Sequence, residues 1–172
     1  MAVLYRQIPQ EAEHSPVDPW PGRGRFGDGT HLVLYLSSTA TGAIAEFLRR
    51  HPEFLELQDR LRIQLFRIEM LVDGNTLNLR GEACRERVGI SLASLTSSDA
   101  NEDVRYEDCR VLARKVATVA IGLCSPSAAI QDGTWTLALF NEPEDGEWRP
   151  ANHIEEDRPF VEPSHVQLFS SA

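Results

Sequence analysis

Cysteine is scarce in this sequence of 172 residues. The three that occur, Cys84, Cys109 and Cys124, are an odd number and form no C-x-x-C pair. Disulfide frameworks and cysteine-rich zinc sites both need more cysteines at characteristic spacings. The sequence therefore predicts reduced, buried thiols rather than a disulfide-stabilised fold.

Motifs that bind metals are missing, and those that bind nucleotides are weak. The five histidines are scattered without an H-x-x-x-H pair, and no P-loop or G-x-S-x-G occurs. The run from Gly22 to Gly27 has glycines at the G-x-G-x-x-G spacing, but it lies inside a predicted loop and does not join a predicted strand to a helix, so it is a weak signal. We therefore expect no metal site and no serine nucleophile on a sharp strand-to-helix turn.

Positive charge is in deficit, because the formal net charge is −9. An acidic chain argues against direct nucleic-acid binding and against an anionic membrane surface as partner. No apolar run approaches the length of a membrane span, and residues 1–6 resemble no signal peptide. We expect a cytoplasmic protein whose oligomeric state the sequence leaves open.

The pattern of apolar residues predicts both strands and helices without strict alternation, which favours an α+β fold with a compact mixed sheet and flanking helices. Strands are predicted at residues 2–8, 31–36, 61–72, 76–79, 135–140 and 165–169. Helices are predicted at residues 40–50 and 106–121, with Gly122 ending the second. Loops are predicted at residues 9–30, 94–103 and 141–164. We expect one domain over residues 1–172, with 142–164 a proline-rich acidic loop.

A local group of arginines stands out in this acidic chain. Arg6 lies on the first predicted strand, and Arg23 and Arg25 lie in a glycine-rich loop. Glycines let the backbone approach a ligand, and arginine binds phosphate through paired N–H groups. The group therefore favours a pyrophosphate site, although a solvated surface loop would give the same pattern.

Three further residues are candidates for a site. Glu46 lies off the apolar stripe of the helix at 40–50, so it either faces solvent or faces a ligand. Because it lies off that stripe, we expect that replacing it disturbs packing little and changes stability by no more than about 0.5 kcal/mol. Tyr35 is either a core residue or a stacking platform, and Ser127, just past a predicted helix end, either bonds local backbone or completes a site.

In their order along the chain, these pieces resemble the RES-domain family, which is named for an arginine, a glutamate and a serine. The corresponding segments are Tyr5-Arg6, Gly24-Arg25-Phe26-Gly27, Leu34-Tyr35-Leu36-Ser37, Ala43-Ile44-Ala45-Glu46 and Pro126-Ser127-Ala128. In the second of them, Phe26 and Gly27 replace the tryptophan and asparagine that are usual in the family. An apolar strand, Leu137 to Asn141, follows the last of them, as it does in the family.

The resemblance implies a fold similar to the ADP-ribosyltransferases and an activity that degrades NAD⁺, which is substrate rather than cofactor. It implies that Arg6 and Arg25 bind phosphate groups and that Tyr35 packs on the nicotinamide side. Glu46 and Ser127 would complete the site, with Arg6, Tyr35, Glu46 and Ser127 in catalytic roles. It also implies a bacterial toxin whose partner is an antitoxin with an Xre-type helix-turn-helix domain.

Cleavage of the nicotinamide–ribose bond suits this set of residues. A carboxylate stabilises the positive charge that develops on the ribose, and arginines orient the pyrophosphate. Water and phosphate both remain open as acceptors. Two alternatives also remain: an ADP-ribosyltransferase that modifies a macromolecule, and a non-enzymatic interaction or immunity protein with the same fold.

Overall fold

The computed structural model describes residues 2–9, 15–20, 24–29, 32–52, 63–70, 75–97 and 102–140. The strands are β1 (Ala2–Pro9), β2 (Val33–Ser37), β3 (Ile63–Met70), β4 (Thr76–Asn78), β5 (Gly122–Pro126) and β6 (Trp135–Phe140). The helices are α1 (Ala40–Arg50), α2 (Glu82–Val88), α3 (Leu92–Thr96) and α4 (Glu102–Ala117).

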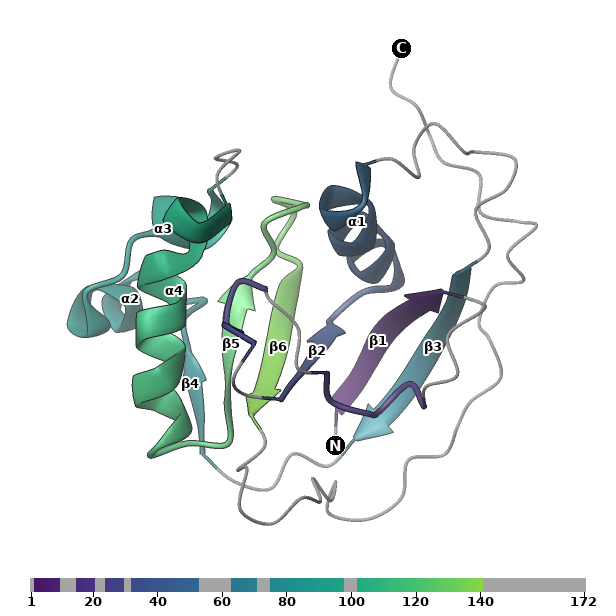
Figure 1. Cartoon of the computed structure of the whole chain (residues 1–172), viewed down its shortest axis with the longest axis horizontal. Helices are drawn as coiled ribbons and strands as arrows, with labels where there is room; N and C mark the ends of the chain where they lie inside the picture. Colours follow the sequence, from purple (N-terminus) through teal and green to yellow (C-terminus); the bar gives the residue numbers. More distant parts are fainter. Residues whose placement is uncertain are drawn as a thin grey trace.

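The strands form one mixed sheet in the order β3-β1-β2-β6-β5-β4 (Figure 1). Neighbouring strands are antiparallel except for β4 and β5, which are parallel. This arrangement confirms the predicted α+β class. The closer likeness to ADP-ribosyltransferases stays a prediction.

The sheet is weakly joined between β1 and β2. The register there contains one pair, Tyr5 with Ser37, whereas β1 pairs with β3 along its whole length, from Ala2–Met70 to Pro9–Ile63. Beyond that pair, β1 and β2 make no further ladder pairing, although both strands are fully described. This junction, with α1 packed on β1, β2 and β3, provides the space for a cavity.

The sheet is covered on both faces by apolar side chains. On β2, Val33 and Tyr35 pack with a cluster that includes α3 and α4, whereas Leu34 and Leu36 pack with a second cluster on the opposite face. Successive residues of a strand point to opposite faces. This burial on both sides explains why the sequence here is a continuous apolar run, and it confirms the predicted strand, shifted by one to two residues.

Helix α1 has the predicted bounds because its end signals are local. Thr39 has extended backbone angles, and its side chain accepts a hydrogen bond from the Gly42 N–H at 3.0 Å. The helix ends where the His51 N–H donates to the Phe47 carbonyl, just before Pro52. Ser and Thr caps and a following proline are standard helix limits.

The predicted helix at 106–121 is wrong at both ends, since α4 runs from Glu102 to Ala117. Gly122 does not end a helix but begins β5. A Cβ at this position would lie 2.3 Å from the Ala138 carbonyl oxygen, so glycine is needed for close strand packing. Ser127 consequently follows a strand, not a helix.

The predicted loop at 94–103 is also partly wrong. Residues 92–96 form α3, whose start is capped by Ser91 accepting from the Ser94 N–H at 2.9 Å, and residues 102 and 103 belong to α4. The serines that suggested a loop are helix caps, which the same residue types also favour. The prediction for residues 80–93 left α2 unassigned.

The remaining predicted segments at 141–164 and 165–169 lie outside the described residues. Over the ranges that are described, no helix is long and apolar enough to cross a membrane.

Candidate active site

A cavity of about 470 Å³ lies at the junction of β1, β2 and α1. Its wall includes four of the five predicted site residues: Arg6, Arg25, Tyr35 and Glu46. The volume lies in the range of small-molecule sites. The fifth residue, Ser127, does not line the cavity, but its hydroxyl donates a hydrogen bond to the Glu46 carboxylate.

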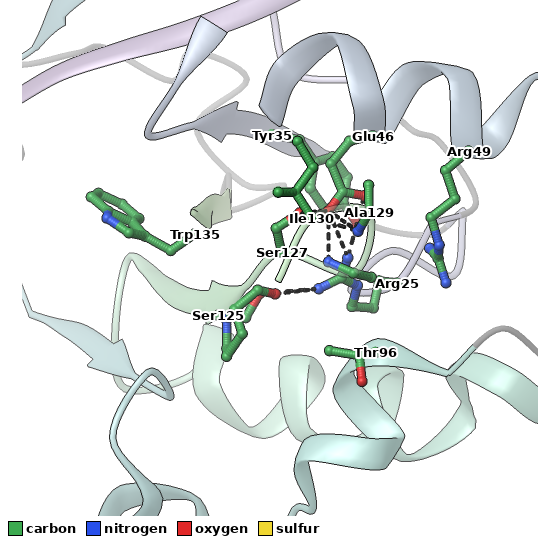
Figure 2. Close-up of polar contacts among 12 residues, drawn as sticks. Arg25, Tyr35, Glu46, Arg49, Thr96, Ser125, Ser127, Ala129, Ile130 and Trp135 are labelled. Carbon is green, nitrogen blue, oxygen red and sulfur yellow. Dashed lines mark hydrogen bonds and ion pairs between the residues drawn. The ribbon is translucent and has the colours of Figure 1, made fainter. Parts of the chain in front are cut away.

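The Glu46 carboxylate is the point where several donors converge (Figure 2). Its Oε1 accepts hydrogen bonds from the Ser127 hydroxyl at 2.7 Å, the Ala128 N–H at 2.8 Å and the Ala129 N–H at 3.4 Å. The Arg25 guanidinium lies 3.2 Å from Oε1 and 3.4 Å from Oε2. The carboxylate is thereby fixed in place by residues from two separate segments, the one that carries Arg25 and the turn after β5.

Glu46 does not face solvent, because its side chain is only 17% exposed. Burial would raise its pKa, but the Arg25 charge and the hydrogen bonds from Ser127 and Ala128 outweigh burial and lower the pKa below its ordinary value. Glu46 is therefore ionised at neutral pH. The interpretation of Glu46 as a solvated residue that can be replaced at little cost is wrong.

Arg25 connects α1 to the end of β5. Its side chain is 5% exposed. One terminal nitrogen binds Glu46, and the other donates to the Pro126 carbonyl at 3.0 Å and to the Ser125 hydroxyl at 3.3 Å. Both terminal nitrogens thus have protein partners, and the predicted contact of Arg25 with phosphate stays a prediction.

Ser127 is held by the turn that follows β5. Its hydroxyl oxygen accepts from the Ala129 N–H at 3.1 Å and the Ile130 N–H at 3.2 Å while it donates to Glu46. The two interpretations of this residue, a turn serine and a site serine, therefore describe the same hydroxyl. Ser127 is only 1% exposed, so its hydroxyl has little surface for a direct contact with a ligand. Its effect on the site is the hydrogen bond that it donates to Glu46.

Tyr35 lies beside this network on β2. Its hydroxyl accepts from the Phe26 N–H at 2.9 Å, and burial raises the pKa of the phenol. The Arg50 guanidinium lies 4.7 Å from the centre of its ring, a cation–π distance. The ring is therefore both a wall of the cavity and a support for a cation.

Arg6 reaches the same cavity without joining the Glu46 network. Its Nη1 donates to the Pro16 carbonyl at 2.8 Å and to the Asp18 carbonyl at 2.7 Å. Burial lowers the pKa of Arg6 to about 10, with Asp18 opposing and Arg50 adding to the shift. Arg6 remains a cation at neutral pH. Arg23 lies outside the described residues.

Sequence reasoning missed Arg50, an exposed cation in the cavity wall. The sequence pattern predicts Arg50 only as the last residue of the helix at 40–50, and the structure places it in the last turn of α1. Its spacing of four residues from Glu46 was an available signal, because residues four apart share a helix face. Across the described ranges, His, Cys, Asp and Glu do not gather in threes that could hold a metal ion.

Comparison with family models matches residues 4–160 to the RES domain. Searches of curated proteins and of solved structures each returned no match. The matched range includes every predicted site residue from Arg6 to Ser127.

Proposed function

This chain belongs to the RES-domain family, and from that premise we propose that it degrades NAD⁺ by cleaving the nicotinamide–ribose bond, as the toxin of a bacterial toxin–antitoxin pair. RES domains are linked to NAD-related enzymatic activity. The observation that carries the proposal is the fixed, ionised Glu46 carboxylate in the wall of the cavity.

In the proposed reaction, the bond between C1′ of the ribose and the pyridinium nitrogen breaks. The electron pair goes to that nitrogen, so nicotinamide leaves as a neutral molecule. Positive charge develops on the ribose, and Glu46 stabilises it electrostatically. An oxygen of water or phosphate then bonds to C1′, and the attacking oxygen loses its proton to solvent. Glu46 stabilises this charge best if its carboxylate neither moves nor takes up a proton. The four donors that bind the carboxylate hold it in place and favour its charged form.

The remaining cations of the wall suit the pyrophosphate. Arg50 is exposed and supported by the ring of Tyr35, and Arg6 lies close enough that the two cations influence one another. We assign Arg6 and Arg50 to the phosphates and Arg25 chiefly to Glu46, with Tyr35 on the nicotinamide side. Ser127 is then a positioning residue, because its hydroxyl touches the carboxylate.

A protein antitoxin of the Xre helix-turn-helix type is proposed as partner. The cavity wall carries the exposed side chains of Trp20 and Arg50, and an acidic group of the partner could bind Arg50 where a phosphate would bind. If the partner acts by blocking entry, NAD⁺ protects the free protein from binding it. A partner that binds equally well with the cavity filled contradicts this placement.

The decisive experiment incubates the pure protein with NAD⁺, with and without inorganic phosphate, and identifies the products. Release of nicotinamide with ADP-ribose indicates hydrolysis, and a phosphorylated ADP-ribose formed only with phosphate indicates phosphorolysis. Labelled protein or nucleic acid from radioactive NAD⁺ would instead indicate ADP-ribosyl transfer. Unchanged NAD⁺ under all conditions would overturn the proposal in favour of a non-enzymatic role.

A further inference from the structure

The register of the sheet aligns residues with hydroxyl side chains in a row across four strands. Ser125 of β5 pairs with Thr136 of β6, Thr136 pairs with Ser37 of β2, and Ser37 pairs with Tyr5 of β1. Paired residues of adjacent strands point to the same face. Four residues that carry hydroxyls therefore cross the sheet side by side, and Tyr5, Ser37 and Thr136 line the cavity.

The residues of this row differ in whether their hydroxyls have hydrogen-bond partners. Ser125 accepts from Arg25, and Ser37 accepts from the Thr39 N–H at 3.4 Å. Thr136 Oγ1 is buried and has no hydrogen-bond partner within the described part of the chain, and its residue is 6% exposed. Gln7, two residues from Tyr5 on β1, also lines the cavity, and its buried Nε2 is likewise without a described partner.

Such groups are unusual, because a buried polar atom without a partner is costly and most find one in protein, water or ligand. Two of them belong to residues, on different strands, that line one cavity. Their cost is offset if a ligand completes both. The geometry therefore points to a second polar subsite in the cavity floor, distinct from the arginines.

We propose that Gln7 and Thr136 bind an uncharged polar group of the substrate, either a carboxamide or a ribose hydroxyl. This inference rests on the proposed function and extends it to substrate recognition. Gln7 Nε2 can only donate, so it requires an acceptor oxygen, and the Thr136 hydroxyl can donate or accept. Because Arg6 and Arg50 are assigned to the phosphates, the neutral groups of NAD⁺ remain for this subsite.

Thr136→Val tests the proposal, because valine keeps the shape of threonine and removes only the hydroxyl. In the free protein the variant melts at the wild-type temperature or above it, since an unsatisfied polar atom is lost. Binding of NAD⁺ weakens by about tenfold, the cost of one good hydrogen bond. Thr136→Ser retains the hydroxyl and keeps near-normal affinity, and Gln7→Met weakens binding as Thr136→Val does.

Thr134→Val is the matched control. Thr134 is also buried, but its hydroxyl lies 3.3 Å from the Thr39 hydroxyl and its residue does not line the cavity. This variant melts about 2–4 °C lower and, while folded, binds NAD⁺ normally. If Thr136→Val melts lower in the same way, its hydroxyl has a structural partner and the proposal is overturned.

Calorimetry with separate probes distinguishes the ligand group. Weaker binding of free nicotinamide to Thr136→Val, with ADP-ribose unaffected, identifies the carboxamide, and the reverse identifies a ribose hydroxyl. Unchanged affinity for NAD⁺ and both fragments overturns the subsite while wild-type turnover leaves the proposed function intact. Wild-type protein that neither binds nor turns over NAD⁺ overturns both.

Discussion

At the scale of single residues, Glu46 combines burial with ionisation. Its side chain is 17% exposed, yet its pKa is lowered because burial is outweighed by Arg25, Ser127 and Ala128. A group whose pKa is lowered by folding stabilises the native state above its unfolded pKa of about 4.5. This contribution is lost as the pH falls through the folded value.

Glu46→Gln keeps the shape of the side chain and removes the charge. We expect turnover of NAD⁺ to fall by roughly a hundredfold to a thousandfold, with NAD⁺ binding largely retained. The variant also loses about 1.5–3 kcal/mol of stability, because Arg25 no longer faces a charge. Kinetics, calorimetry and melting curves measure the three quantities separately.

Glu107→Gln is the control, since Glu107 is an exposed residue whose side chain is 63% exposed and 3.8 Å from Arg114. It should match the wild type in all three measurements. Near-normal turnover of Glu46→Gln, despite lower stability, would mean that Glu46 is a structural ion-pair partner and not part of catalysis.

Ser127→Ala removes one donor from Glu46 and leaves the charge. Because that hydrogen bond helps lower the pKa of Glu46, its loss raises the pKa. The acid limb of the pH profile of turnover should then move to higher pH. The profile is measured from neutral pH down past 4.5, the ordinary pKa of a glutamate. An unshifted limb with uniformly lower turnover would show that Ser127 only holds the turn after β5.

At the scale of elements, α1 positions the carboxylate through its close approach to the sheet. The helix begins at the Thr39 cap, and Gly42 in its first turns lies against Ser37 and Thr134. A Cβ at Gly42 would lie 2.5 Å from Ser37 Oγ and from Thr134 Cγ2. Glycine is therefore required here by space, since the helix itself would favour alanine.

Gly42→Ala should lower both stability and turnover, although alanine in an open helix position would add about 1 kcal/mol. The added methyl displaces α1 from the sheet, and Glu46 moves with the helix. Turnover therefore falls by a larger factor than the affinity for NAD⁺, because Arg6 lies on β1 and stays in place. Gly81→Ala, where a Cβ meets nothing within 4 Å, is the control: it should keep wild-type turnover and lose only the small stability that a glycine N-cap gives α2 over alanine. Wild-type melting and turnover of Gly42→Ala would show that α1 can shift without moving the carboxylate.

At the scale of the whole molecule, the site is built where the sheet is least continuous. The single β1–β2 pair leaves room for a cavity, and the segment 24–29 lies between α1 and α4, with Arg25 bound to Glu46 and Arg110 donating to the Gly24 carbonyl at 3.2 Å. The apolar cluster around Cys109 in α4 supports that segment from the other side.

Cysteine reactivity reports on this cluster. Cys109 is fully buried, and burial raises the pKa of its thiol to about 11. Thiolates react and thiols do not, so Cys109 should resist iodoacetamide at neutral pH until the molecule unfolds. Cys84, which is partly exposed, should react first. Mass spectrometry of samples alkylated along a urea series measures both, and native-state labelling of Cys109 at the rate of Cys84 would contradict the buried position.

The sequence was most informative where structure depends on neighbouring residues. The bounds of α1 and β6 matched the predictions, since Thr39 and Pro52 limit the helix locally and the apolar run at 135–140 has no competing breaker. Local signals failed where a residue type serves two purposes. The local pattern predicts a helix end at Gly122 because glycine commonly ends helices, but close packing against Ala138, 16 residues away on β6, requires this glycine.

The chemical types of the site residues were likewise available from the sequence, because their order matches the RES pattern. What only the tertiary structure decided is which of them meet. Arg25, Glu46 and Ser127 are separated by 21 and 81 positions, and no local periodicity relates such residues. Their contact, the burial that makes Glu46 costly to replace and the unpartnered Thr136 hydroxyl all follow from strand register and from the packing of α1 on the sheet, which bring together groups that the chain keeps far apart.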